Sequence, residues 1–157
     1  MEDEQIPRPA KLVCFELQGQ EYAADIHSIK ESLPQRPIAR VPLTPLWLTG
    51  IINLRGDVVA IVDLSLFLGM ARTKISTDSR IIIAQSEGRT LGLVCDSLRM
   101  LRTIDIDQVQ ATPATLAPSC AAMLEGVLPL SDGSTLQILN ISAIVNSKEL
   151  TTFRRGA

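Results

Sequence analysis

Residues 50–69 read GIINLRGDVVAIVDLSLFLG, and this segment contains a pattern that recurs along the chain. Two apolar runs rich in β-branched residues flank Arg55-Gly56, where glycine can adopt the positive φ that a tight hairpin turn requires. Asp63 then precedes a short apolar run that ends before Gly69, which is typical of a helix with an N-cap and a terminating glycine. The segment therefore predicts a β-hairpin followed directly by a short helix.

Three further hairpins are expected from the same pattern. Their turns lie at Gln18-Gly19, Glu87-Gly88 and Asp132-Gly133, each between short apolar arms. A second capped helix is expected after Asn140, and another helical turn is expected over residues 25–33. Four hairpins with β-rich arms favour a mostly β protein.

The hairpins and capped helices occur twice in the same order, which predicts an internal repeat. Gly19 corresponds to Gly88, 69 residues later, and Gly56 corresponds to Gly133. If each linker contributes one strand, each copy has five strands, which can curl into a small barrel with little exposed edge. The alternative is coincidence, because glycine turns recur in any β protein. The polar segment 70–79 is the expected junction between the copies.

Composition excludes several classes of function. Of 157 residues, 46% are hydrophobic and 20% charged, as in globular chains that fold without disulfides or metals. The 15 basic and 17 acidic residues give a net charge of −2 without a basic cluster, so no nucleic-acid partner is expected. No apolar run approaches the roughly twenty residues of a membrane span, and the acidic N-terminus does not resemble a signal peptide. We expect a cytoplasmic protein without direct membrane insertion.

Candidate catalytic and metal-binding residues are few. His27 is the one histidine, and it has no Cys or acidic pair at ligand spacing. Cys14, Cys95 and Cys120 form no C-x-x-C pair and are expected to be small core residues, although a small cysteine-dependent enzyme stays open as an alternative. No glycine-rich phosphate loop is present. We therefore expect no cofactor, no metal and no catalytic residue, which favours a binding or scaffold role.

Several segments together form a specific pattern that extends over nearly the whole chain. The most specific is the turn Asn53-Leu54-Arg55-Gly56, followed by the strand end Val62-Asp63-Leu64. The other segments are Phe15-Glu16-Leu17, Gln20-Glu21-Tyr22-Ala23, Ile29-Lys30-Glu31, Val41-Pro42, Leu91-Gly92-Leu93-Val94 and Ile138-Leu139-Asn140-Ile141. In this order the segments resemble the CheW family of chemotaxis coupling proteins. Ala60 and Ser65 depart from the proline and arginine that are frequent in that family, which leaves the particular receptor and kinase open.

The resemblance implies a single domain over residues 11–148 that contains two SH3-like, five-stranded β-barrels and short helices, one of them near the C-terminus. We expect one subdomain at about residues 11–70 and the other at about 80–140, with strand exchange between them allowed. Residues 1–10 are expected to be a flexible arm and residues 149–157 a tail.

The resemblance also implies a non-enzymatic adaptor. Such a protein couples the cytoplasmic tip of transmembrane chemoreceptors to the regulatory domain of a CheA-type histidine kinase, and is a monomer alone that joins membrane-associated arrays with its partners. The implied interface residues are Ile29, Glu31, Gly50 and Arg55 for kinase or receptor, and Leu98 and Leu101 for the receptor.

Several alternatives stay open at this point. Leu98 and Leu101 could be ordinary core residues, and Arg55 could be a turn residue with a local salt bridge. An adaptor of this kind could also serve a pilus, gliding-motility or second-messenger pathway. It could also cap arrays instead of building them.

Overall fold

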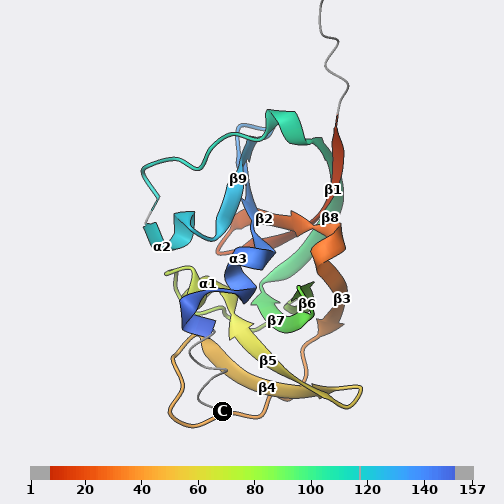
Figure 1. The fold of residues 1–157 in the computed structure, drawn as a ribbon, viewed down its shortest axis with the longest axis vertical. Coiled ribbons are helices and arrows are strands. Elements are labelled where there is room, and N and C mark those ends of the chain that lie inside the picture. The colour runs from red at the N-terminus through yellow and green to blue at the C-terminus, as the bar shows by residue number, and fades with distance from the viewer. Residues whose placement is uncertain (1–7, 117, 151–157) are drawn as a thin grey trace, which may run out of the picture.

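The structure is a computed structural model that describes residues 8–116 and 118–150 (Figure 1). Within these residues the chain forms ten strands, three short α-helices and two 3₁₀ turns. The strands are β1 (Pro9–Leu17), β2 (Gln20–Asp25), β3 (Ile29–Pro34), β4 (Leu48–Leu54), β5 (Asp57–Asp63), β6 (Arg80–Ser86), β7 (Arg89–Cys95), β8 (Ser97–Asp105), β9 (Leu124–Pro129) and β10 (Thr135–Leu139). The helices are α1 (Leu64–Phe67), α2 (Pro118–Ala121) and α3 (Ile141–Val145), and the 3₁₀ turns are η1 (Ile26–Ser28) and η2 (Ile106–Gln108).

The strands form two five-stranded sheets with matching topology. Sheet A has the order β8-β1-β2-β10-β9, and sheet B has the order β3-β6-β7-β5-β4. The first copy of the repeat comprises β1–β5 and α1, and the second comprises β6–β10 and α3. Replacing every strand with its counterpart in the other copy converts one order into the other, which confirms the internal repeat and the mostly β, two-unit fold.

The sheets divide the chain differently from the repeat. Sheet B is built from the continuous segment 29–95, whereas sheet A combines residues 9–25 with residues 97–139. The expected limits, about 11–70 and 80–140, followed the repeat and do not coincide with this division. The physical reason is that the third strand of each copy pairs with the first strand of the other copy, so each sheet takes strands from both.

All four predicted hairpins are present. In the turns Gln18-Gly19, Arg55-Gly56 and Glu87-Gly88 both residues have positive φ, as in the two-residue turns whose twist matches that of the flanking strands. The fourth hairpin joins β9 to β10 and also contains a glycine with positive φ, Gly133.

The predicted capped helices are also present. The side chain of Asp63 accepts a hydrogen bond from the backbone N–H of Leu66, and Asn140 accepts one from Ala143. The helical turn expected over residues 25–33 is wrong beyond η1. Residues 29–34 instead form β3, because their backbone groups pair with β6 and alternate side chains face the interior.

The core has three layers. The largest lies between the sheets, where α1 and α3 pack with Phe15, Tyr22 and the faces of β6 and β7 that carry Ile82 and Leu93 (Figure 1). Smaller clusters fill the inside of sheet A, around Leu136, and of sheet B, around Ile81. The middle layer makes the two sheets one packing unit.

The described parts of the expected arm and tail are ordered. Strand β1 begins at Pro9, and the Arg8 guanidinium pairs with Asp107 at 2.9 Å. Near the other end, the Leu150 side chain is buried in the middle layer. The rest of the arm, residues 1–7, and of the tail, residues 151–157, lies outside the described residues.

Candidate interaction surfaces

Four of the six expected interface residues lie on two equivalent edge strands, Ile29 and Glu31 on β3 and Leu98 and Leu101 on β8, whereas Gly50 lies on β4 and Arg55 in the β4–β5 turn. Strands β3 and β8 are first in their sheets, and each pairs with one named strand only. Ile29 on β3 corresponds to Leu98 on β8 through the repeat. Both strands contain a register shift close to this position. Such bulges redirect side chains at functional edges. On β8 the large apolar side chains beside the bulge are exposed, whereas Ile29 on β3 is half-buried.

Arg55 and Glu31 form a bidentate ion pair. The two guanidinium nitrogens Nη1 and Nη2 lie 2.6 and 2.7 Å from the carboxylate oxygens of Glu31. The pair joins the β4–β5 turn to β3, which are at opposite edges of sheet B, and therefore helps the sheet to curl. Hydrogen bonding from Arg55 lowers the pKa of Glu31 below its ordinary value of 4.5.

The ion pair leaves Arg55 accessible. Its side chain is 70% exposed, whereas that of Glu31 is 25% exposed. The N–H of Gly56 donates to Asn53 Oδ1 at 2.9 Å, which fixes the turn that carries the arginine. The local salt bridge is thus present, and the guanidinium is still exposed at the surface.

Ile29 and Gly50 lie deeper than Glu31 and Arg55. Ile29 is half-buried against the middle core layer, just after η1. Gly50 is buried, and a Cβ atom at this position would lie 2.2 Å from the carbonyl oxygen of Ala39. Ala39 and Ile51 form a bridge with two backbone hydrogen bonds at this point. Gly50 therefore permits a close backbone approach that positions β4.

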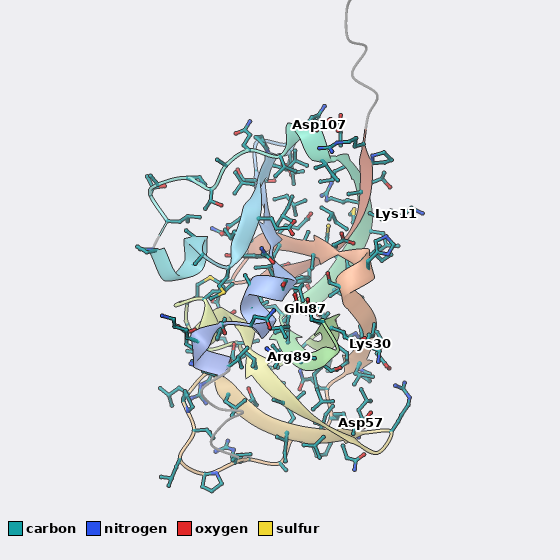
Figure 2. The ribbon with its side chains drawn as sticks, viewed as in Figure 1. Lys11, Lys30, Asp57, Glu87, Arg89 and Asp107 are labelled. Carbon is teal, nitrogen blue, oxygen red and sulfur yellow. The ribbon has the colours of Figure 1, made fainter. Side chains whose placement is uncertain are left out.

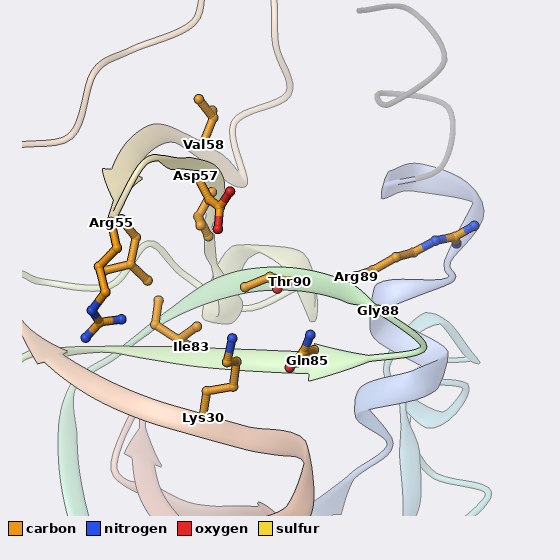
Figure 3. A pocket seen from close by; sticks show the side chains of 11 residues that line it. Lys30, Arg55, Asp57, Val58, Ile83, Gln85, Gly88, Arg89 and Thr90 are labelled. Atoms are coloured by element: carbon orange, nitrogen blue, oxygen red, sulfur yellow. The ribbon is translucent and has the colours of Figure 1, made fainter.

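A groove of about 550 Å³ lies next to this ion pair (Figure 3). Lys30, Arg55 and Arg89 contribute positive charge to its walls, and Asp57 is the acidic residue in its lining. Figure 2 places Lys30, Asp57 and Arg89 around sheet B. Among the described residues no group of three or more His, Cys, Asp or Glu could hold a metal ion. The groove is an open, mostly polar surface.

Strand β8 presents an apolar patch. Leu98 is 39% exposed and Leu101 is 63% exposed, and Met100 between them is exposed too. Neighbouring arginines are paired with carboxylates of the same sheet, since Arg99 pairs with Glu16 and Arg102 Nε lies 2.6 Å from Glu21 Oε2. The two leucines are therefore not core residues. An apolar patch rimmed by paired charges suits a protein interface.

The chain matches the CheW-like domain over residues 11–149. The chain belongs to the CheW family. Chemotaxis protein CheW of Rhizobium meliloti is 30% identical over 139 residues, which are 88% of this chain and 89% of the relative. Protein FrzA of Myxococcus xanthus is 24% identical over 135 residues, 85% and 84% of the respective chains. The crystal structure of the scaffolding protein TtCheW from Thermoanaerobacter tengcongensis has 30% identity and a TM-score of 0.77, covering 89% of this chain and 90% of the other.

CheW-family proteins are scaffolds without enzymatic activity, so the alternative of a cysteine-dependent enzyme is set aside. The thiols themselves are consistent with this. Cys14, Cys95 and Cys120 are buried, and burial raises the pKa of Cys14 and of Cys95 to about 12. Burial also raises the pKa of Cys120. Thiols that stay protonated near neutral pH are weak nucleophiles.

Two features of this CheW-family chain escaped the sequence analysis. Met100 shares the exposed patch with the two leucines, and the imperfect alternation of residues 97–102 was the available signal for it. Pairing of Arg55 with Glu31 had no sequence signal, because the two residues are 24 positions apart, one in the β4–β5 turn and the other on β3. Within the described residues, no helix is long and apolar enough to cross a membrane.

Proposed function

We propose that this CheW-family chain is a non-enzymatic adaptor that couples transmembrane chemoreceptors to a CheA-type histidine kinase in chemotaxis-like signal transduction. The observation that supports this most directly is the pair of different surfaces on equivalent edge strands of one packing unit. One surface is charged and centred on Arg55 and Glu31, and the other is apolar and centred on Leu98 and Leu101. Two chemically different surfaces suit two different partners.

The apolar patch on β8 is assigned to the receptor tip. Exposed leucine and methionine side chains without free charges fit an apolar stripe on a partner. The surface formed by Ile29, Glu31 and Arg55 is assigned to the regulatory domain of the kinase, with Gly50 acting indirectly by positioning β4. The adaptor is a monomer alone in this proposal, and it enters membrane-associated arrays through its partners.

The first experiment is a pull-down of the purified chain with chemoreceptor cytoplasmic fragments and histidine kinase from the same cell. Retention of both partners together is expected. The double variant Leu98→Ser with Leu101→Ser is expected to lose the receptor and keep the kinase. Ile106→Ser is the matched control, because Ile106 is also an exposed aliphatic residue but lies on η2 outside the patch. Retention of neither partner by the unaltered chain would contradict the adaptor function.

A charge exchange separates the two roles of Arg55. Arg55→Glu should lose the kinase while the fold is kept. The double variant Arg55→Glu with Glu31→Arg restores an ion pair across the same two positions. If Arg55 touches the kinase itself, the double variant stays unable to bind. Full rescue would show that the pair is only structural and would remove Arg55 from the proposed interface.

An adaptor for another signalling pathway would use the same two surfaces. FrzA among the relatives shows that the family includes proteins named outside the CheW series. An adaptor for a pilus, gliding or second-messenger pathway would retain the receptors and kinase of that pathway in the same assay. A chain that caps arrays would retain the kinase alone.

A further inference from the structure

A third surface lies at the end of β4 opposite the Arg55 turn. It is formed by residues 35–49, which lead into β4, and by residues 70–77, which follow α1; we call it the loop surface. Its large aliphatic side chains are exposed: Leu43 fully, Leu46 to 75% and Ile75 to more than half. Strand β4 has seven residues and spans about 20 Å, so the loop surface is separate from the Arg55 turn.

The exposed leucines sit on an ordered loop. The hydroxyl of Thr44 donates to the carbonyl oxygen of Val41 at 2.9 Å, and Leu48 N–H donates to the carbonyl oxygen of Pro45. Leu43 has a φ of 60°, in the left-handed region that a bulky side chain rarely occupies. Strained positions of this kind cluster at binding and switch sites, and here the strain holds an aliphatic side chain out in solvent.

The loop surface is basic although the whole chain is slightly acidic. Segments 35–50 and 64–77 contain no Asp or Glu, and they carry Arg36, Arg40, Arg72 and Lys74. Among the described residues none of these four cations forms an ion pair. Asp63 is the acidic residue that lines the groove at this surface, and it is buried. Its carboxylate accepts hydrogen bonds from the N–H and the hydroxyl of Thr73 at 3.0 and 2.9 Å.

A groove of about 360 Å³ runs between the two segments. Aliphatic side chains and cations line it together, among them Leu46, Ile75, Arg40 and Arg72. The Nε2 atom of Gln35 is buried in its wall and donates to no acceptor among the described residues.

We propose that the loop surface binds an acidic segment of a partner protein. An aliphatic side chain of that segment enters the groove beside Leu46 and Ile75, and flanking carboxylates pair with Arg40 and Arg72. Cations without an ion pair beside exposed aliphatic side chains call for a segment that carries both carboxylates and an aliphatic side chain. A protein segment is favoured over a membrane for two reasons. The site is concave, and the aromatic ring nearest to it, Trp47, packs edge-on against Phe67 at 5.2 Å between ring centres instead of facing outward.

The test uses the full chain and two synthetic peptides as probes. One peptide alternates Glu and Leu over eight residues, and the other has Gln in place of every Glu. Binding is measured by calorimetry and mapped by backbone amide NMR shifts. The acidic peptide is expected to shift residues 35–49 and 70–77, and to bind at least tenfold more weakly at 300 mM than at 50 mM salt, because exposed ion pairs are screened. The Gln peptide is expected not to bind.

Variants identify the surface. The double variant Arg40→Glu with Arg72→Glu is expected to abolish binding of the acidic peptide, and Leu46→Ser is expected to weaken it at least fivefold. Matched controls are Arg89→Glu, which reverses an exposed cation of the other groove, and Val58→Ser, which removes an exposed aliphatic side chain there. Both controls should bind as the unaltered chain does. Thermal unfolding of every variant shows that the fold is kept.

Several results would overturn the proposal. These are equal binding of both peptides, shifts outside the two segments, equal loss in the controls, or no binding at all. Binding of phosphatidylglycerol vesicles without binding of the acidic peptide would show that the surface meets a membrane instead. Self-association in sedimentation, abolished by the Arg40 and Arg72 variant, would identify a second copy of the chain as the occupant. No receptor or kinase enters this test, so its failure leaves the adaptor proposal untouched.

Discussion

Substitution of Gly50 by alanine tests whether this glycine serves the fold or a partner. The added Cβ would lie 2.2 Å from the carbonyl oxygen of Ala39 and 2.7 Å from Cγ2 of Ile38. One of these atoms belongs to the backbone, so a side-chain rotation cannot relieve the contact. The segment around Ala39 must move away from β4, and Gly50→Ala is therefore expected to destabilise the fold.

The loss can be estimated from the contacts at this site. Ala39 and Ile51 exchange two backbone hydrogen bonds, at 2.9 and 2.8 Å. Each is worth roughly 0.5–1.5 kcal/mol net, and overpacking a close contact costs about 1–3 kcal/mol. If the segment moves away, the hydrogen bonds are weakened, and if it stays, the contact remains overpacked. We therefore expect Gly50→Ala to lower the free energy of unfolding by about 2–3 kcal/mol. For a chain of this size that lowers the melting temperature by about 5–10 °C.

Urea and thermal unfolding followed by circular dichroism measure this loss. The repeat supplies a matched variant, Gly126→Ala, since a Cβ there would lie 2.5 Å from the carbonyl oxygen of Gln110, and a similar loss is expected. Gly69→Ala is the contrasting control. Its Cβ would meet no atom within 4 Å, and the positive φ of 87° alone should cost about 1 kcal/mol. An unchanged unfolding midpoint for Gly50→Ala, together with loss of a partner, would refute the structural role.

Three further predictions follow from the same structure. Asp63→Ala should cost about 3 kcal/mol in urea unfolding, because it removes the helix cap and leaves the buried N–H of Thr73 unpaired, whereas Asn140→Ala should cost about 1 kcal/mol; equal losses would contradict this account. With pKa values of about 12, Cys14 and Cys95 should react with a thiol reagent at pH 8 far more slowly in the native chain than in urea, and rapid native labelling would show that one of them is accessible. Because the folded-state pKa of Glu31 is below 4.5, its ion pair stabilises the fold above that pH and is lost as the pH falls through the lowered pKa. The stability difference between the unaltered chain and Arg55→Gln should therefore vanish in acid. A Glu31 pKa at or above 4.5, measured by NMR titration, would argue against the pair.

The local elements were readily predicted from the sequence because their signals are local. Glycine at each hairpin turn and Asp63 or Asn140 before a short apolar run are fixed by backbone geometry within a few residues. Pairing between the copies was not predictable in the same way. Which strand lies beside β1 is decided by burial of whole faces against each other, and no short segment encodes that choice.

The candidate surfaces show the same division. The exposure of Leu98 and Leu101 could not be settled from the sequence, because a bulge in β8 interrupts the alternation that normally separates inward from outward positions. The loop surface has a clearer sequence signal, because segments 35–50 and 64–77 contain no acidic residues. It was overlooked because nothing in the sequence shows that these two segments meet.

The chain passes between the two sheets only twice within the described residues, once at η1 and once at Asp96. Strands β3 and β8, which carry the two proposed interfaces, each begin directly after one of these crossings. A single crossing would allow one sheet to rotate relative to the other about that connection. Two crossings, together with the packed middle layer, resist rotation of one sheet relative to the other. A partner that twists one edge strand therefore turns the whole body, and the angle between the two bound partners is set by the adaptor itself.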